Sequence, residues 1–207
     1  MNSLVYSKNT IEFVTVANEF CKFIENTPAQ SLANLVETAH RLLPLLYLKG
    51  TLLPEVENSY EEFNEKFVTE ADYNQIHDLL LEKFADHNTY FEVFDPLRQE
   101  NDELAQLSLA ESLTDIYQDM KDFIMQFQQA SEEIMLNAIW ECRQNFGAYW
   151  GQRTVNVLRA LHYLRYSIVE LDKETTSNSA PKDFNYNNVD TKNWLISRMQ
   201  ENYTDEE

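Results

Sequence analysis

Four acidic residues follow one another at helical spacing near the middle of the chain. They stand at positions i, i+4, i+8 and i+11, as Glu111, Asp115, Asp119 and Asp122. This spacing places them on one face of a helix, and we call them the acidic stripe. Clustered carboxylates suit Mg²⁺ or Mn²⁺, which makes Asp115, Asp119 and Asp122 candidate metal ligands. The ordinary alternative is the solvated side of an amphipathic helix, opposite the core face.

A second candidate site is a segment, residues 142–169, that is rich in arginine and free of acidic residues. It contains Arg143, Arg153, Arg159 and Arg165. The planar guanidinium group binds phosphate and carboxylate well, so these side chains could form an anion- or partner-binding site. The alternative is internal pairing with the acidic middle third of the chain, residues 55–133. Buried pairs would fix the orientation of helices, whereas exposed pairs add only about 0–1 kcal/mol each.

Other catalytic patterns are incomplete. Glu37 and His40 form one E-x-x-H motif, whereas di-iron helical bundles use two. His77, His87 and His162 have no Glu three residues earlier, so a di-iron site is not expected. His162 lies at the edge of an apolar helical face, which is typical of a packed, hydrogen-bonded histidine. The sequence contains no glycine-rich phosphate loop, G-x-S-x-G elbow or H-E-x-x-H motif.

The composition favours a helical globular domain that would position these residues. Hydrophobic residues make up 43% of the 207-residue chain, but there are only 3 Gly and 5 Pro. A β-rich fold needs more tight turns than this, so we expect an all-α fold. Cys21 and Cys142 lie in apolar helical patterns and are expected to be small buried side chains, not disulfide or zinc ligands.

The formal net charge of −19 is distributed unevenly along the chain. Residues 55–133 contain 21 of the 35 acidic residues and only 4 of the 16 basic ones. Such acidity repels phosphate backbones and anionic lipids, so no nucleic-acid or membrane partner is expected. The longest apolar run, residues 42–48, cannot span a bilayer, and Glu12 and Glu19 interrupt any signal-peptide core. These features predict a cytoplasmic protein.

Apolar periodicity predicts a multi-helix bundle of about six main helices in one domain, residues 1–171. The expected helices cover about residues 9–25, from Pro28 to Gly50 or Pro54, 70–84, 109–128, from 132 onwards, and a last helix to Leu171. Thr69 with Asp72 and Ser108 with Glu111 resemble capping boxes. Pro44 should kink the second helix, and the glycines at 147 and 151 should allow a bend or a close helix approach. Residues 86–107 are expected to form a long loop packed by its own aromatic side chains.

The C-terminal part of the sequence differs in character. Residues 172–189 are predicted to be a polar linker, and residues 190–207 a short amphipathic helix with an acidic end. Trp194, Leu195 and Met199 would form the apolar side of that helix. Such a side would dock in a groove of its own domain, of a second copy or of another protein.

Several strings of the sequence are distinctive in combination. They are VYSKN from Val5, EFVTVA from Glu12, LLPLLYL from Leu42, DIYQDMKDF from Asp115, WEC from Trp140, WGQR from Trp150 and RALH from Arg159. Together, over roughly residues 5–166, they resemble a bacterial helical family of uncharacterised proteins, domain-of-unknown-function family 5063. The resemblance implies a recurring bacterial domain that includes the acidic stripe and the arginine segment. It implies no activity, and it makes the tail an extension.

Two functions remain open from the sequence. The first is a non-enzymatic protein-interaction or regulatory module that uses an acidic helical face, with a protein partner or self-association and no cofactor. The alternative is a metal-assisted phosphoryl or nucleotide hydrolase. In it, Asp115, Asp119 and Asp122 hold a divalent metal, and Arg143 or Arg153 binds phosphate. The position of the stripe relative to the arginines distinguishes these two hypotheses. If the stripe and the arginines are buried side by side, they have a structural role. If they line one open cleft, that cleft is a candidate active site. If they lie on separate surfaces, each is a candidate docking face.

Overall fold

The computed structural model describes residues 4–57, 65–91, 105–167 and 171. Within these ranges the α-helices are α1 (Lys8–Glu25), α2 (Leu32–Thr51), α3 (Glu70–Phe84), α4 (Leu109–Phe127), α5 (Glu132–Asn145) and α6 (Gly151–Tyr166). Short helical turns are η1 (Leu4–Tyr6), η2 (Thr27–Ala29), η3 (Ala85–His87) and η4 (Phe146–Trp150). The all-α bundle predicted from the sequence is therefore confirmed. None of the described helices is long and apolar enough to cross a membrane.

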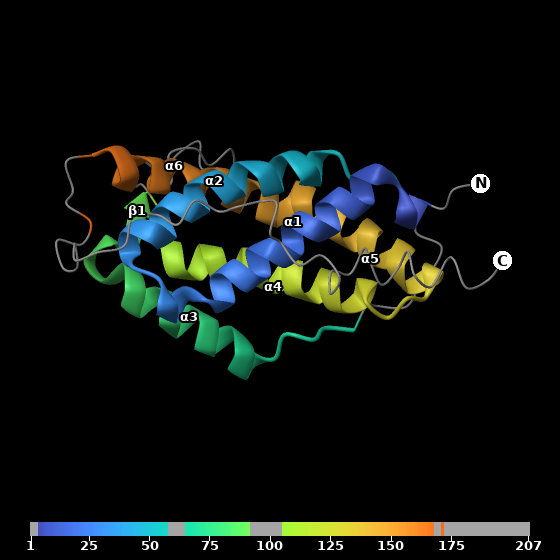
Figure 1. Cartoon of the computed structure of the whole chain (residues 1–207), viewed down its shortest axis with the longest axis horizontal. Coiled ribbons are helices and arrows are strands. Elements are labelled where there is room, and N and C mark those ends of the chain that lie inside the picture. The colour runs from blue at the N-terminus through green and yellow to red at the C-terminus, as the bar shows by residue number, and fades with distance from the viewer. Residues whose placement is uncertain (1–3, 58–64, 92–104, 168–170, 172–207) are drawn as a thin grey trace, which may run out of the picture. The chain divides into compact units, whose positions relative to one another are not determined.

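Helix α4 lies at the centre of the described domain. It packs against α1, α3, α5 and α6, while α2 runs beside α1 and α6 (Figure 1). Its leucine, isoleucine and phenylalanine side chains are buried, and so are its polar residues Ser112, Thr114, Asp122 and Gln126. A helix buried on nearly every side needs internal partners for its polar groups. The buried carboxylates of the acidic stripe must therefore have hydrogen-bond partners inside the protein.

Local hydrogen bonds explain where several helices begin. Thr69 and Asp72 form the predicted capping box: the Asp72 backbone N–H donates to Thr69 Oγ1, and the Thr69 N–H donates to the Asp72 carboxylate. Ser108 Oγ accepts from the Glu111 N–H at the start of α4. These bonds satisfy N–H groups that have no partner within a helix. Pro44 lies inside α2, which continues as one helix to Thr51.

The connection from α5 to α6 stays helical. The five residues Phe146–Trp150 form a π-helical turn between the two helices, so the chain does not leave the helical path at the glycines. Trp150 is fully buried, and its Nε1 donates to the Cys142 carbonyl oxygen at 3.0 Å. Helix α2 reaches the same ring through Gly50, where a Cβ atom would lie only 2.6 Å from the indole. Gly50 therefore permits the close approach.

Two expectations about connecting segments need correction. Residues 86–107 were expected to be a loop, but strands β1 (Thr89–Phe91) and β2 (Gln106–Ser108) pair antiparallel at the two ends of this stretch, and residues 92–104 lie outside the described residues. Asn88 also links the two ends of this stretch: its Oδ1 accepts a hydrogen bond from the Ala110 N–H, and its backbone oxygen accepts one from the Leu109 N–H. Helix α6 ends at Tyr166 instead of Leu171. The linker, the predicted C-terminal helix and its docking residues all lie outside the described residues.

The two cysteines occupy the core as the apolar pattern predicts. Cys21 on α1 and Cys142 on α5 are both buried and free. Burial raises the pKa of both thiols, so neither is a reactive thiolate at neutral pH.

Candidate functional site

The acidic stripe points mainly into the protein. Glu111 is exposed, but the side chain of Asp115 is only 11% exposed and that of Asp122 only 4%. The expectation that the stripe forms the solvated side of α4 is therefore wrong for Asp122. The reason is that α4 is covered on the stripe side by α5, η4 and α6 and by the chain segment before α3.

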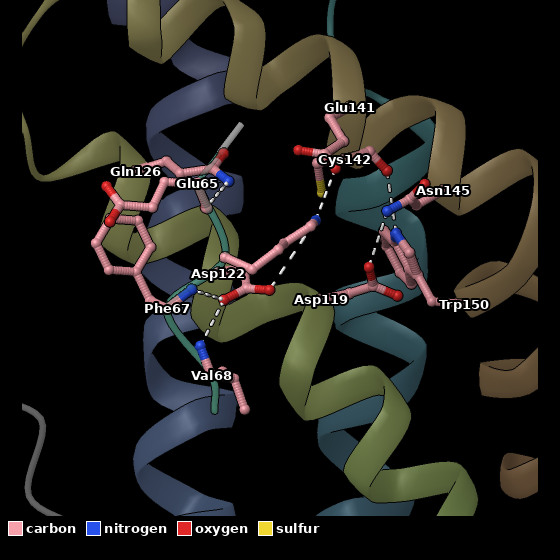
Figure 2. Close-up of polar contacts among 11 residues, drawn as sticks. Glu65, Phe67, Val68, Asp119, Asp122, Gln126, Glu141, Cys142, Asn145 and Trp150 are labelled. Carbon is pink, nitrogen blue, oxygen red and sulfur yellow. Dashed lines mark hydrogen bonds and ion pairs between the residues drawn. The ribbon is translucent and has the colours of Figure 1, made fainter. Parts of the chain in front are cut away.

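Asp122 fastens that segment, residues 65–68, to α4. Its Oδ1 accepts hydrogen bonds from the backbone N–H groups of Phe67 at 2.8 Å and Val68 at 2.9 Å. Figure 2 shows both backbone groups facing the carboxylate. One helical turn further along, Gln126 Nε2 donates to the Glu65 carbonyl oxygen at 3.0 Å. A buried carboxylate with two backbone donors is well satisfied, so Asp122 has a clear structural role.

Lys66 links the segment to two carboxylates on different helices. Its Nζ lies 2.6 Å from Glu141 Oε1 on α5 and 4.0 Å from Asp122 Oδ2 on α4. Its side chain is about half exposed, at 50%, whereas that of Glu141 is 24% exposed. Burial, the largest single cause, acts to lower the pKa of Lys66, but the hydrogen bond to Glu141 and the nearby acids together raise it. Lys66 therefore balances part of the negative charge gathered here.

Asp119 completes this polar cluster. Its Oδ1 accepts from Asn145 Nδ2 at 2.9 Å (Figure 2). Burial, the largest cause, raises the pKa of Asp119 to about 6, and Asp122 and Glu141 add to that rise. Burial also raises the pKa of Asp122, against the two backbone donors. The cavity enclosed by these groups is only about 10 Å³, which is space for about one water and not for a hydrated Mg²⁺.

Asp115 has a separate set of partners. Tyr73 on α3 donates to its Oδ1 at 2.7 Å, and Tyr149 on η4 donates to its Oδ2 at 2.5 Å. Arg153 on α6 lies 3.6 Å from Oδ2 and also donates to Ser112 Oγ. Burial raises the pKa of both tyrosines, that of Tyr149 to about 12. Asp115 therefore joins three helical elements through hydroxyl and guanidinium donors.

The arginines of residues 142–169 are placed at separate locations. Arg153 pairs with Asp115, and Arg143 donates to Glu55 at 2.6 Å and to the Leu53 carbonyl oxygen at 2.7 Å. Arg165 pairs with Glu37, whereas Arg159 is exposed. Internal pairing with residues 55–133, the alternative to an anion site, thus describes Arg143 and Arg153, whereas Arg165 pairs internally with a residue outside that region. The stripe and the arginine segment meet at one partly buried ion pair, which indicates a structural role at that point.

The structure reveals a histidine contact that spacing could not predict. His40 Nε2 lies 3.1 Å from His162 Nδ1, across the packing of α2 on α6. Arg165 Nη1 lies 3.2 Å from His40 Nδ1, and Arg165 also reaches Glu37 at 3.0 Å. Burial, together with the nearby arginines, lowers the pKa of His40. The single E-x-x-H motif therefore contributes to helix packing.

The described residues offer no metal site. Among them, no group of three or more His, Cys, Asp or Glu side chains could hold an ion. Asp115 binds tyrosine and arginine, Asp119 binds an amide, and Asp122 binds backbone N–H groups. The predicted metal ligands thus have protein partners, and the hydrolase hypothesis gains no support from their geometry.

A cleft that the sequence did not reveal opens between α3 and α4, with a volume of about 390 Å³. Its apolar lining consists of Phe67, Val68, Ile76, Leu79 and Met125. Its polar lining consists of Glu25, Asp72, Gln75, Tyr117 and Lys121. Glu25 Oε1 accepts from Tyr117 at 2.9 Å and from Lys121 at 2.7 Å. The i, i+4, i+8 spacing of Tyr117, Lys121 and Met125 was the available signal for one wall. The opposite wall comes from α3 and from residues 67–68, and their position beside α4 is not visible in the sequence.

Several exposed acidic side chains lie on α3, whereas in the acidic stripe of α4 only Glu111 is exposed. Glu70, Asp78 and Glu82 are exposed, and we call these three residues the α3 acidic face. The side chain of Asp78 is 78% exposed, and its contact is with His77. Within the described ranges, neither Glu70 nor Glu82 forms an ion pair. Leu81, a large apolar side chain, is 40% exposed on the same helix.

Comparisons with known proteins agree with this fold. A family model described as a domain of unknown function, DUF5063, matches residues 4–167. The crystal structure of protein BF1032 from Bacteroides fragilis, a structural genomics target, superposes with a TM-score of 0.72 and 40% sequence identity. The match covers 80% of this chain and 97% of that one. No curated protein is significantly similar to the chain.

Proposed function

Because the chain belongs to the DUF5063 family of domains of unknown function, we propose its function from its own surface: a non-enzymatic protein-interaction module. It presents the α3 acidic face to a basic segment of a protein partner. The observation that carries this proposal is the exposure of Glu70, Asp78 and Glu82, in contrast to the buried and bonded carboxylates of α4.

Exposed charge that is not used for folding is well suited to recognition. The chain carries a net charge of −19, so it attracts basic partners over a distance of about one Debye length, roughly 8 Å at physiological salt. Such steering raises association rates and suppresses binding of acidic partners. Leu81 adds an exposed apolar side chain to the same helix, and an apolar contact of this kind contributes affinity that charge alone does not.

The acidic helical face that the sequence suggested is thus assigned to α3 instead of α4. Asp115, Asp119 and Asp122 act as internal acceptors, so a partner cannot use them without opening the bundle. The acids of α3 can be neutralised without removing a described ion pair other than the one between Asp78 and His77. This difference makes the proposal testable by substitution.

The test compares two variants with the same change in charge. The first is E70Q/D78N/E82Q on α3, and the control is E19Q/E132Q/E133Q on α1 and α5, where all three acids are exposed. The α3 triple removes one acid from the first turn of a helix and the control removes two, so helix-dipole stabilisation should fall at least as much in the control. Both variants are first checked for unchanged thermal unfolding.

Tagged full-length protein is used to capture partners from a bacterial lysate at low salt, and bound proteins are identified and purified. We expect a basic partner whose affinity falls about tenfold with the α3 variant and less than twofold with the control. High salt should reduce the wild-type affinity. Equal binding to both variants, or no partner at low salt, would refute the proposal. Sedimentation of the purified chain shows whether the partner is a second copy.

A further inference from the structure

We infer that the cleft between α3 and α4 is a pocket for one large apolar side chain of a basic partner segment. The inference rests on the proposed function, because it names the anchor by which such a segment would bind beside the α3 acidic face. Its evidence is separate, and consists of the size of the cleft, its walls, the charge of its rim and the way in which one wall is held.

The size of the cleft suits a side chain or a small fragment. Its volume of about 390 Å³ lies at the low end of the range for ligand pockets, roughly 300–1,000 Å³. An extended cofactor or a dinucleotide would need more space. Protein interfaces gain most of their affinity from a few large side chains that fill pockets, most often tryptophan, tyrosine or arginine.

Both walls of the cleft contribute apolar side chains beside polar ones. Phe67 and Val68 form one part, Ile76 and Leu79 of α3 a second, and Met125 of α4 a third. Methionine is flexible and polarizable, and it adapts to aromatic partners at binding surfaces. An aromatic or aliphatic side chain bound here would bury apolar surface against these apolar side chains, which is favourable.

The charged groups at the cleft favour a cation beside the apolar group. Glu25 and Asp72 carry two negative charges, and Lys121 carries one positive charge. Tyr117 and Lys121 both donate to the same oxygen of Glu25, Oε1. A Lys or Arg next to the anchor would meet excess negative charge at the cleft and again at Asp78 and Glu82 further along α3, whereas an acidic segment would be repelled.

One wall of the cleft is fixed before any partner arrives. The backbone N–H groups of Phe67 and Val68 donate to Asp122, and Lys66 next to them pairs with Glu141. Since both wall residues are held by this polar cluster, little ordering is needed on binding, and such preorganisation improves affinity. Asp122 of α4 therefore supports the pocket indirectly, as a positioning residue.

The experiment uses the full-length protein and two blocked peptides, Lys-Lys-Trp-Lys-Lys and Lys-Lys-Ala-Lys-Lys. Binding is followed by isotope-edited NMR titration. We expect the tryptophan peptide to bind about tenfold more tightly than the alanine peptide. The amide signals of Val68, Ile76 and Leu79 should shift only with the tryptophan peptide. Equal affinities, or shifts confined to other surfaces, would overturn the inference.

Two leucine-to-tryptophan variants provide the matched control. L79W fills the cleft from α3, whereas L48W changes the same residue type at an exposed position of α2, outside the lining. We expect L79W to remove the tenfold advantage of the tryptophan peptide and L48W to keep it. If L79W does not fold, M125W blocks the cleft from α4 and serves the same purpose. Equal behaviour of the blocked and control variants would contradict the inference.

Two further measurements separate this inference from the proposed function. If E70Q/D78N/E82Q retains the tryptophan advantage but binds both peptides as well as wild type does, the pocket stands and the acidic-face proposal fails. If that variant binds both peptides more weakly, and wild type binds the tryptophan and alanine peptides equally, the acidic-face proposal is supported and the pocket inference is refuted.

Free tryptamine should bind at least tenfold more weakly than the tryptophan peptide. Equal affinity would assign the cleft to a small amine and overturn the partner-segment inference.

Discussion

Helices α3 and α4 both carry acidic residues at helical spacing, yet the two sets of carboxylates have opposite surroundings. On α3, Glu70, Asp78 and Glu82 are exposed. On α4, the three aspartates of the stripe accept hydrogen bonds from tyrosines, an asparagine and backbone N–H groups. The difference arises from position in the bundle, because α4 is packed on several sides. Spacing shows which side chains share a face, whereas the neighbouring helices decide whether that face binds partners or maintains the fold.

The largest effect should come from removing Asp122. In D122A the N–H groups of Phe67 and Val68 lose their acceptor, and Lys66 loses one of its two acidic neighbours. Buried donors without partners are costly, so we expect the free energy of unfolding to fall by about 3 kcal/mol. Urea denaturation followed by circular dichroism measures this change.

D122N is the control for Asp122, because it keeps one carbonyl oxygen as an acceptor for the two N–H groups, while it removes the charge and replaces the second oxygen with an NH₂ group. We expect it to lose less than half as much stability as D122A. A loss below about 0.5 kcal/mol for D122A, the range of ordinary surface substitutions, would show that this carboxylate does not hold residues 65–68.

A smaller effect, of opposite sign, should follow from D119N. Burial raises the pKa of Asp119 from 3.8 to about 6, so between about pH 4 and pH 6 the folded chain binds more protons than the unfolded chain. The Asp119 contribution to stability therefore falls as pH rises through that window and stays low above it. Asparagine avoids this penalty and can still accept from Asn145. We expect D119N to be more stable than wild type by about 2 kcal/mol at pH 7.

The pH dependence provides the check on D119N. Thermal or urea unfolding at several pH values should give a difference between variant and wild type that is near zero at about pH 4, increases to about pH 6 and is constant above. A difference that does not change across this range would contradict the assignment of the raised pKa to Asp119.

The smallest expected effects distinguish residues within α3. Thr69 caps the helix, since its Oγ1 accepts from the Asp72 N–H at 3.2 Å, and T69A should cost about 1 kcal/mol. Asp78 is exposed and caps nothing, so D78N should change the free energy of unfolding by less than about 0.5 kcal/mol. Paired urea denaturation curves measure both. A loss for D78N as large as that for T69A would mean that the α3 acidic face contributes to folding.

The sequence predicted most helices well because their signals are local. The capping box at Thr69 and the start of α4 after Ser108 were found from spacing alone, since a cap involves residues only three positions apart. The all-α class followed from the low Gly and Pro content. The end of α6 was placed five residues too late, because apolar residues such as Ile168 and Leu171 continue the pattern beyond Tyr166.

The candidate site was harder to predict because its contacts join distant segments. Asp122 was found as part of a stripe, but its partners at residues 67 and 68 are more than 50 positions away. The strands β1 and β2 were missed because each has only three residues, too few for a clear alternation. The cleft depends on α3, α4 and residues 67–68 together. No window of sequence contains such a site.

The central claim is that the acids of α3 bind a partner while those of α4 maintain the fold. Its most direct test is the affinity of the blocked Lys-Lys-Trp-Lys-Lys peptide for wild type, E70Q/D78N/E82Q and D119N, measured by isothermal titration calorimetry. The account predicts about tenfold weaker binding for the α3 variant and a change below twofold for D119N, which removes a carboxylate that faces inward. Unchanged binding by the α3 variant, or an equal loss in D119N, would contradict it.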